Sequence, residues 1–489
     1  MKKIILLNIT ALSLFTNSCT LGPVFKGVET KADQQETFLN VSPSYQAQYS
    51  MKNWWLSIND PLLEAYIKQL LDENLDLKEA AERVIQAREN LAIQRGGKMP
   101  EISADISGNR SFTPTSANNF LPQSSKKRFF NNSNTADINV SWQLDFFGKM
   151  KRTIEARESE FSATIHDREA LIHSLIAELV NVRVAIASNN NSLELAKENA
   201  KNRQKVYDLV QKRYKLGVKN TYLSDVYLAE DDYNTAQGEV HEFERLLAAD
   251  IYNFDILLGQ APGTTTALSS SFPLLPPPID IPIALPANLL DRRPDLRAAK
   301  LRVKAANANI GVAIADLYPS LSIGASLGFA QGNNGSLVGG VDQIAGSLFG
   351  SITTKLFQGG ALRANIRLQK SEVRELAANY SNLVLNAMRE VETALKSEQE
   401  ISKKLGNIRK SVIALQDAES LSEVRYLSGI MTLNEFLNIK QKRYLAEKSW
   451  IAIQQQQWNN RLELYLALGG DWLDDKSKAS LKKNLIYHF

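Results

Sequence analysis

The chain has 489 residues, a formal net charge of +4 and 44% hydrophobic residues. Its basic residues do not cluster with aromatic ones, which excludes the electrostatic footprint of a nucleic-acid-binding protein. It contains one cysteine, so an intrachain disulfide is excluded as well.

Residues 1–18 predict an export signal, because two lysines precede an apolar run and no acidic residue occurs before Cys19. The position of Cys19 at the end of this signal predicts a lipidated N-terminal cysteine. Thr16 stands where lipoprotein signals usually carry leucine, and an ordinary signal peptide with an incidental thiol stays open as the alternative. No run of 18 apolar residues follows, so we expect any membrane crossing to use strands.

The rest of the chain consists of two similar sequence repeats. Asp76-Leu77 recurs as Asp295-Leu296, an offset of 219 residues, and each copy ends on a leucine-glycine pair. A period near 200 residues is too long for a stacked solenoid, so we expect one duplicated unit with long parts. The predicted organisation is a first repeat at 19–259, a proline-rich linker at 260–290, a second repeat at 291–470 and a charged tail at 471–489.

Four stretches alternate between polar and apolar residues and predict strands at about 101–110, 135–146, 320–330 and 346–356. A half-buried soluble sheet gives the same alternation. Strand lengths near ten residues and long polar loops favour a membrane barrel instead. Because four strands cannot close a barrel with a polar lumen, several chains must share it.

Two segments without proline, from Lys149 to Leu216 and from Gly360 to Ser428, carry apolar residues at helical spacing. Each would form a helix roughly 100 Å long at 1.5 Å per residue, so these helices must pack lengthwise against others. Gly217 and Gly429 follow them in Arg-Tyr-x-x-Gly contexts, where a helix end needs a left-handed residue.

Signatures of catalysis are missing from the sequence. It has no His-Glu-x-x-His motif, phosphate-binding glycine loop, Cys-x-x-Cys pair or nucleophile elbow. His166 and His173 lie seven apart, but two histidines without a third ligand predict packing or surface roles. Asp231-Asp232 predicts a solvated helix face. We therefore predict no enzyme, no cofactor and no metal site.

Several motifs carry a family resemblance. The motif Leu289-Leu290-Asp291-Arg292-Arg293-Pro294-Asp295 resembles the outer-membrane efflux channels of the TolC/OprM type, in particular the lipoprotein branch. Cys19-Thr20-Leu21-Gly22-Pro23, Asp145-Phe146-Phe147-Gly148 and Tyr318-Pro319-Ser320 resemble them too, and the match spans nearly the whole chain in order.

The resemblance implies a fold class, an α+β membrane protein built as a homotrimer. Each chain would give four strands to a shared twelve-stranded outer-membrane β-barrel and long helices to a periplasmic α-barrel. The N-terminal segment, the linker and the C-terminal tail would form an equatorial region. The implied location is the cell outer membrane, lipid-anchored and extending into the periplasm.

The implied function is the exit channel of a tripartite efflux pump, passively conducting small molecules such as drugs from the periplasm to the outside. Implied partners are a periplasmic adaptor (membrane fusion) protein and an inner-membrane transporter of the RND type. Protein (type I) secretion is the alternative within the fold. A non-conducting lipoprotein scaffold is an alternative of another class, although it leaves the amphipathic strands unexplained. Six methionines without a cluster make a copper or silver exporter the weaker expectation.

The resemblance also implies site residues at the periplasmic tips. Gly217, Val218, Gly429 and Ile430 would contact the adaptor. Where the family places a leucine and an aspartate to narrow the pore, this chain has Asn434 and Asn438, which could close the tip by hydrogen bonding without titrating.

Glu435 and Asp225 lie near enough to supply charge at the tip instead. Two extra residues near Thr221-Tyr222 distinguish the first tip from the second and could alter adaptor choice or simply enlarge a turn. On the predicted strands Asp105, Asp137 and Asp145 fall on the polar face. They predict a lumen with mild cation preference.

Overall fold

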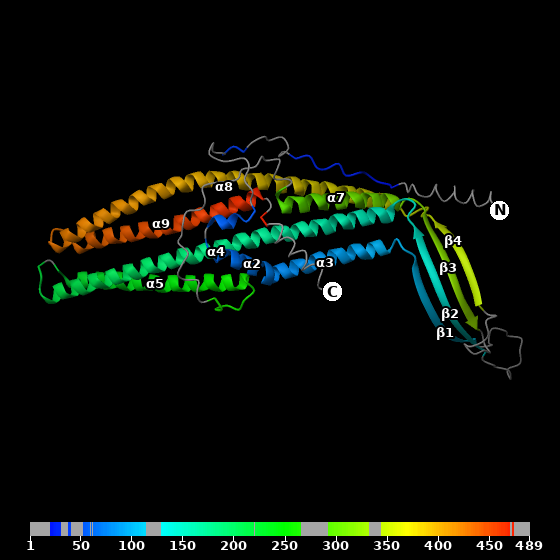
Figure 1. Cartoon of the computed structure of the whole chain (residues 1–489), viewed down its shortest axis with the longest axis horizontal. Helices are drawn as coiled ribbons and strands as arrows, with labels where there is room; N and C mark the ends of the chain where they lie inside the picture. The colour runs from blue at the N-terminus through cyan, green and yellow to red at the C-terminus, as the bar shows by residue number, and fades with distance from the viewer. Residues whose placement is uncertain are drawn as a thin grey trace. The chain divides into compact units, whose positions relative to one another are not determined.

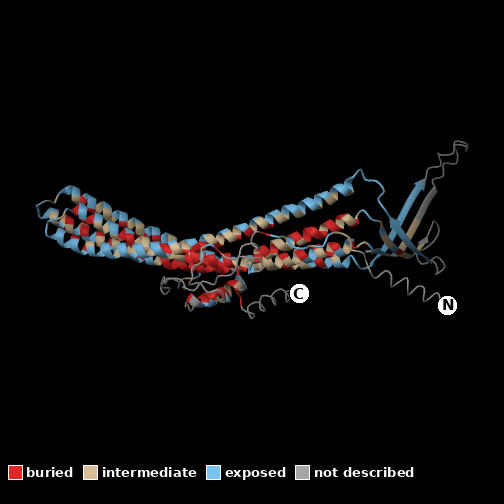
Figure 2. Cartoon of the chain, turned by 90° about the horizontal axis from the view of Figure 1, so that it is seen from above, coloured by how far each residue is buried: buried red, intermediate tan, exposed pale blue. Residues whose placement is uncertain are grey.

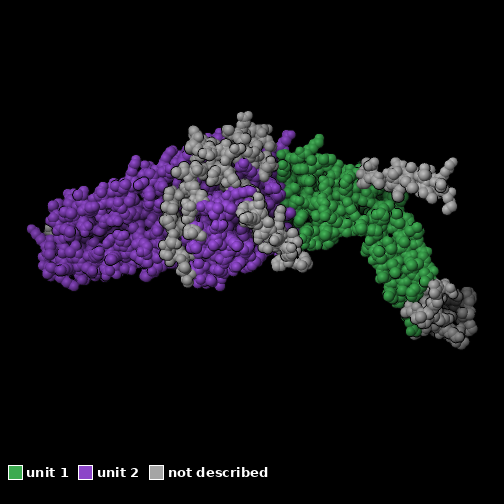
Figure 3. Space-filling model, viewed as in Figure 1, with its two compact units in different colours: residues 1–28, 85–164, 299–379 green, residues 29–84, 165–298, 380–489 purple. Residues whose placement is uncertain are grey.

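The computed structural model describes residues 20–30, 38–40, 52–58, 60, 62–113, 129–219, 221–265, 292–331, 344–469 and 472–473. Cys19, the predicted signal, most of the predicted linker and most of the predicted tail lie outside these residues. The chain divides into two compact units (Figure 3). Unit 1 holds residues 1–28, 85–164 and 299–379, and unit 2 holds residues 29–84, 165–298 and 380–489.

The described elements repeat in the order that the duplication predicts (Figure 1). The first set is η2 (Trp54–Ile58), α2 (Leu63–Glu73), α3 (Leu75–Gly96), β1 (Glu101–Thr113), β2 (Phe129–Leu144), α4 (Lys149–Lys215) and α5 (Leu223–Leu257). The second set is α7 (Pro294–Ala315), β3 (Ser320–Gln331), β4 (Ile344–Thr353), α8 (Ala361–Leu427) and α9 (Leu433–Leu468). Helices α4 and α8 are each 67 residues long, so the two copies match in their longest part.

In unit 1 the four strands form one antiparallel sheet in the order β1-β2-β3-β4. The register aligns the two faces across all four strands. Ile102, Val140, Ala325 and Leu348 form one cross-strand row, and Ser103, Asn139, Ser326 and Ser347 form the next. One face is therefore largely apolar, with Arg110 and Asn134 as polar residues toward one end of β1 and β2, and the other is largely polar, as the alternation predicted.

Two predicted strands end earlier than expected. β2 stops at Leu144 because the Asp145 carboxylate accepts hydrogen bonds from the backbone N–H groups of Met150 (2.9 Å) and Lys151 (2.8 Å). Asp145 therefore supplies acceptors for free N–H groups at the start of α4, where a negative charge is favourable, and its assignment to a strand was wrong. β4 ends at Thr353, three residues before the predicted limit.

The largest apolar cluster of unit 2 surrounds tryptophan side chains. Trp54 contacts Tyr465, with ring centroids 4.7 Å apart, and Trp472, with centroids 5.5 Å apart. Buried residues of α4 between Ile172 and Ala187 belong to this cluster, and Figure 2 shows buried positions gathered in this part of unit 2. Removal of this apolar surface from water stabilises the packing of α2, α4 and α9.

Helix α4 contains an 18-residue stretch with a mean hydropathy of 1.6, apolar enough by composition to cross a membrane. In the structure 61% of that stretch is buried. Since the long buried part of α4 packs into the tryptophan cluster, burial against neighbouring helices explains its apolar composition.

Buried ion pairs join helices of unit 2 at fixed points. Arg461 Nη2 of α9 lies 2.6 Å from a carboxylate oxygen of Glu398 of α8, and Asn460 donates to the same carboxylate at 3.0 Å. Arg183 of α4 pairs with Asp60 at 3.2 Å. Removing one partner of such a buried pair typically destabilises a protein by about 3–5 kcal/mol, so these contacts fix the lengthwise register of the helices.

Candidate functional site

The two helix reversals of unit 2 are built alike. Gly217 has φ +68°, its N–H donates to Tyr214 O at 3.0 Å, and the N–H of Val218 donates to Arg213 O at 3.0 Å. The second reversal repeats both bonds around Gly429, whose φ is +78°. This is the Schellman motif, in which a left-handed glycine lets the chain satisfy the last helical carbonyls. The predicted capping role of both glycines agrees with this geometry.

Carboxylates begin the two returning helices. Glu435 accepts from the Thr432 N–H at 3.0 Å, while Glu435 N–H donates to Thr432 Oγ1 at 3.3 Å, so the pair forms a capping box for α9. These hydrogen bonds from Thr432 hold the pKa of Glu435 below its usual range. Asp225 likewise accepts from the Tyr222 N–H at 2.8 Å, at the start of α5. The two carboxylates that were expected to supply charge at the tip therefore also serve as caps.

Asn434 and Asn438 lie one turn apart on α9, and both side chains are exposed. Exposure in the single chain leaves both amides able to hydrogen-bond to groups outside it. Val218 and Ile430, the residues after the turn glycines, are exposed to 37% and 71%.

A small apolar cluster joins the hairpin α4/α5 to the hairpin α8/α9 beneath the turns. It contains Val206, Val210, Val226, Ala229, Tyr426, Leu433, Phe436 and Leu437. The rings of Tyr426 and Phe436 stack with centroids 5.0 Å apart, and the Arg213 guanidinium lies 5.2 Å from the Tyr426 centroid. Burial raises the pKa of Tyr426. The tip is thus a packed unit of four helix ends.

The two tip connections differ in length, as expected from the two extra residues. The connection 216–222 is two residues longer than the connection 428–432. Thr221 and Tyr222 lie in the longer connection, immediately before α5.

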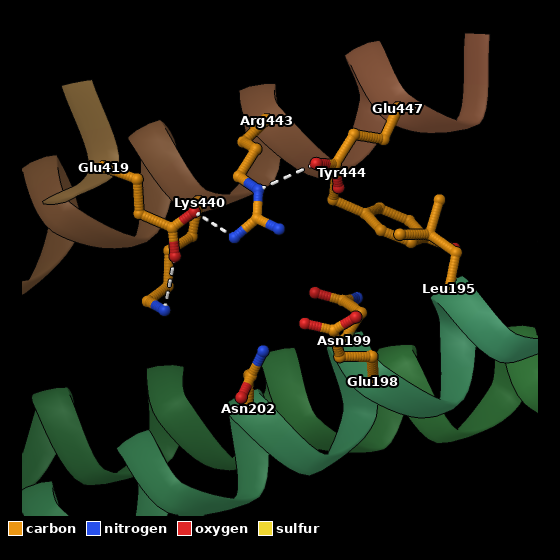
Figure 4. Close-up of a pocket in the computed structure, with 9 residues that line it drawn as sticks. All are labelled: Leu195, Glu198, Asn199, Asn202, Glu419, Lys440, Arg443, Tyr444 and Glu447. Carbon is orange, nitrogen blue, oxygen red and sulfur yellow. Dashed lines mark hydrogen bonds and ion pairs between the residues drawn. The ribbon is translucent and has the colours of Figure 1, made fainter. Parts of the chain in front are cut away.

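A cluster of charged residues lies between α8 and α9, facing α4 (Figure 4). Glu419 accepts from Lys440 at 2.7 Å and from Arg443 at 2.8 Å, and Arg443 also donates to Glu447 at 3.0 Å. Burial alone would raise the pKa of Glu419, but the hydrogen bonds from Lys440 and Arg443 outweigh it and hold the pKa below its usual range. The ion pairs with Lys440 and Arg443, rather than burial, therefore set the direction of the pKa shift of Glu419.

The cluster borders a cavity of about 20 Å³, across which Glu198, Asn199 and Asn202 of α4 lie (Figure 4). A cavity of this size holds about one water molecule. It has no room for a drug-like ligand, so we assign it no cargo-binding role.

A second charged contact links the hairpins directly. Arg203 of α4, whose side chain is 2% exposed, donates to Asp232 of α5 at 2.6 Å and to Gln441 of α9 at 2.9 Å. Burial lowers the pKa of Arg203 and raises that of Asp232, so desolvation outweighs the attraction between them. Asp231 is exposed and Asp232 is half-buried, so the predicted solvated face holds in full only for Asp231.

Sequence reasoning missed these contacts, although a signal existed. Glu419 precedes Gly429 by ten residues and Lys440 follows it by eleven, so a hairpin folded at that glycine must bring them together. Arg203 and Asp232 are related to Gly217 in the same way. Opposite charges at matching distances from a turn glycine predict such pairs.

On the polar face of the sheet, Asp105 lies directly opposite Asp137 in the β1/β2 register. Asp105 accepts from Asn139 Nδ2 at 2.9 Å. Gly328 of β3 stands opposite Asp137, and a side chain there would collide with the Asp137 carboxylate. Two of the three predicted lumen carboxylates thus share one row of the polar face, whereas Asp145 lies beyond the strand.

The sheet has one largely polar and one largely apolar face, and the 67-residue helices that follow its strands end in glycine turns. Together these features define a membrane channel of the helical-barrel type. A sequence profile described as outer membrane efflux protein matches residues 66–259 and 285–470. The chain belongs to this family. The two matched segments end at residues 259 and 470, where the two predicted repeats also end, and the first begins at residue 66, inside the predicted first repeat.

Known relatives extend over the whole chain. It is 28% identical over 480 residues to the antibiotic efflux pump outer membrane protein ArpC of Pseudomonas putida, covering 97% of each protein. It is 25% identical over 475 residues to the cation efflux system protein CusC of Escherichia coli O6:H1, covering 94% of this chain and 97% of the relative. The solved outer-membrane channel OprN matches with a TM-score of 0.80 and 26% identity, over 93% of this chain and 100% of that one.

The predicted family resemblance and fold class are therefore confirmed: the chain has the TolC-like fold of trimeric outer-membrane channels. The family, the efflux pump relative and the solved channel also confirm the predicted function. The chain is the outer-membrane exit channel of an efflux pump.

Proposed function

We propose that this chain works as a lipid-anchored homotrimer that passes drug-like small molecules received from an RND-type transporter through a periplasmic adaptor. The observation that carries the proposal is the described sheet, in which one face is largely apolar and the other largely polar. Such a sheet places lipid on one side and water on the other once it closes with further copies.

Conduction and rescue together test this proposal. The purified protein, reconstituted in planar bilayers, should give discrete single-channel currents, and it should restore drug resistance to a strain that lacks its own exit channel. A scaffold would give neither result. Restored resistance to inorganic cations alone would contradict drug-like cargo; the Escherichia coli relative is named as part of a cation efflux system.

We propose that Asn434 and Asn438 close the periplasmic end through hydrogen bonds between three copies. Asparagine does not titrate, and the hydrogen bonds that Glu435 accepts from Thr432 lower the pKa of Glu435. The two asparagine positions should therefore add little pH dependence to the resting conductance near about pH 4 to 5, whereas Asn438→Asp should add an acid-dependent change near the ordinary aspartate pKa of about 3.9. A steep acid response of the unmodified channel that Asn438→Ala abolishes would contradict this gate.

We propose that the tip residues Gly217, Val218, Gly429 and Ile430 contact the adaptor. Val218 and Ile430 expose apolar side chains beside the turns, which suits a partner that covers them. Ile430→Asp should lower the amount of adaptor that co-purifies with the channel. The matched control is Ser428→Asp at a neighbouring exposed position of the same turn, which should leave the yield unchanged.

We propose that Asp105 and Asp137 give the pore a mild cation preference, since carboxylates that line a pore attract cations. The reversal potential across a salt gradient measures this preference. Replacement of both residues by asparagine should move the reversal potential toward zero, and an anion-selective unmodified channel would refute the assignment.

We propose that Cys19 is the lipid-modified N-terminus of the mature chain. Mass spectrometry of the N-terminal peptide should find a diacylglyceryl group on Cys19 together with an amide-linked acyl chain. A peptide that begins elsewhere, or that carries a free thiol, would contradict this proposal.

A further inference from the structure

The first described residues of the chain, Thr20–Pro23, run against α4 and α7 within unit 1. We name these four residues the strap. Lys151 Nζ of α4 donates to Thr20 Oγ1 at 3.0 Å, and Asn307 Nδ2 of α7 donates to Pro23 O at 3.0 Å. Both ends of the strap are therefore held by side chains of helices.

Arg152 of α4 binds the middle of the strap. Its Nε donates to Leu21 O at 2.9 Å and its Nη2 donates to Gly22 O at 3.1 Å, while Nη1 pairs with Glu155 at 2.8 Å. Arg152 is only 5% exposed. A buried guanidinium needs acceptors for its N–H groups, so loss of the strap would leave this charge under-satisfied. The planar fork of arginine suits two adjacent carbonyls, which a lysine ammonium cannot bind in the same way.

Glycines allow the strap to approach α7 closely. A Cβ at Gly311 would lie 2.8 Å from Leu21 O and 2.9 Å from Arg152 Cγ, and a Cβ at Gly22 would lie 2.5 Å from Gly311 Cα. Gly311 lies inside α7, where glycine weakens a helix relative to alanine. The contact with the strap gives a physical reason for a glycine at this position.

We infer that the strap is a clasp that holds the start of α4, from the first copy, against α7, from the second copy, and that fixes Thr20 beside Gly148, between β2 and α4. Thr20 Cα lies 3.0 Å from a Cβ built on Gly148, just before α4 begins. A lipid on Cys19, which rests on the proposed lipidation, is then attached one peptide unit away, about 3.8 Å along the chain. The clasp thus ties the anchor to the strand-helix junction.

Limited trypsin digestion of the intact, membrane-extracted protein tests the clasp. Lys26 is exposed just after the strap, so cleavage there releases the N-terminal peptide, and its rate reports how often the segment detaches. Arg152→Lys removes hydrogen bonds between the strap and a buried charge, and Gly311→Ala fills the space in which the strap lies. Each variant should therefore raise the cleavage rate about tenfold or more. Gly406→Ala in α8 is the matched control, since a Cβ there meets nothing within 4 Å.

A cleavage rate for Gly311→Ala equal to that of Gly406→Ala overturns the clasp. If Gly311→Ala does not assemble, Asn307→Ala, which removes only the bond to Pro23 O, is digested instead, and an unchanged rate for it also overturns the clasp. The mass of the released peptide shows separately whether Cys19 carries a lipid. Slow cleavage with an unmodified peptide supports the clasp and refutes the lipid anchor.

Discussion

Single glycines decide how each long helix ends. At Gly217 and Gly429 the backbone is left-handed, and the same two hydrogen bonds close each turn. A Cβ at either position would meet nothing within 4 Å, so space does not select glycine there. Backbone conformation does, because a left-handed residue with a side chain is strained.

Gly429→Ala should destabilise the tip by roughly 1–2 kcal/mol, the cost of a left-handed conformation for a residue with a Cβ. Gly406→Ala, inside α8 with open space around it, should instead stabilise its helix by up to about 1 kcal/mol. Amide hydrogen exchange in residues 424–436 and in the middle of α8 measures the two effects. Equal, small changes for both variants would show that the turn conformation carries no strain.

At the scale of the helix, two carboxylates of the hairpins respond to burial in opposite ways. Glu419 has two cationic donors and keeps a lowered pKa, whereas half-buried Asp232 has one and its pKa is raised. The stability that Glu419 contributes is present above its unfolded pKa and is lost as the pH falls through the lowered folded value. The contribution of Asp232 is present below its unfolded pKa and is lost as the pH rises through the raised folded value.

Glu419→Gln should therefore destabilise the protein at neutral pH by about 1–3 kcal/mol, the usual range for lost hydrogen bonds to charged groups. Asp232→Asn should change stability by less than about 1 kcal/mol, since this carboxylate is partly solvated and its charge is already disfavoured. Thermal unfolding from acid to neutral pH gives the measurement. The penalty of Glu419→Gln should shrink toward acid, and a penalty that grows there would contradict the assigned pairing.

At the scale of the whole molecule, the described sheet has open edges. β1 and β4 are the outer strands of the order β1-β2-β3-β4, and each pairs with one neighbour only among the described strands. Unpaired backbone groups cannot stay exposed to hydrocarbon, so the sheet needs further copies to close. The exposed apolar row, with Leu348 81% exposed, would then face lipid.

Leu348→Lys should oppose membrane insertion by about 2–4 kcal/mol per copy, the range for a lysine on the lipid face near the bilayer centre. Ser347→Lys, one residue away on the polar face, is the matched control and should insert normally. Insertion into vesicles, together with native mass spectrometry showing three chains per assembly, checks both points. Equal insertion of the two variants would place the apolar face away from lipid.

Local sequence signals found most of the elements. Alternation identified the strands of unit 1 because successive strand side chains point to opposite faces. It extended the second strand too far, since Asp145 continues the alternation in letters while its carboxylate serves the first turn of α4. In the sequence, a residue that caps the next helix can therefore look like one more residue of the strand before it.

The candidate site was predicted less completely than the fold. The turn glycines were found because their conformation is a local property, and Glu435 was noted for its charge but not for its cap with Thr432. The charged contacts of Arg203, Glu419 and Arg443 were missed. They join residues of different helices, and their burial depends on which faces the hairpins turn toward each other.

The sequence by itself determined the duplication, the strands and long helices, the turn glycines and the family to which the chain belongs. These follow from period, composition and short motifs, which are properties of neighbouring residues. The caps formed by Asp145 and Glu435 are also local, since their partners lie three to six residues away, although the sequence analysis did not identify them. Only the tertiary structure decided that Arg203 is buried between two hairpins and that Arg152 and Gly311 receive the strap. Both depend on which distant groups meet in space and on how much water is excluded where they meet.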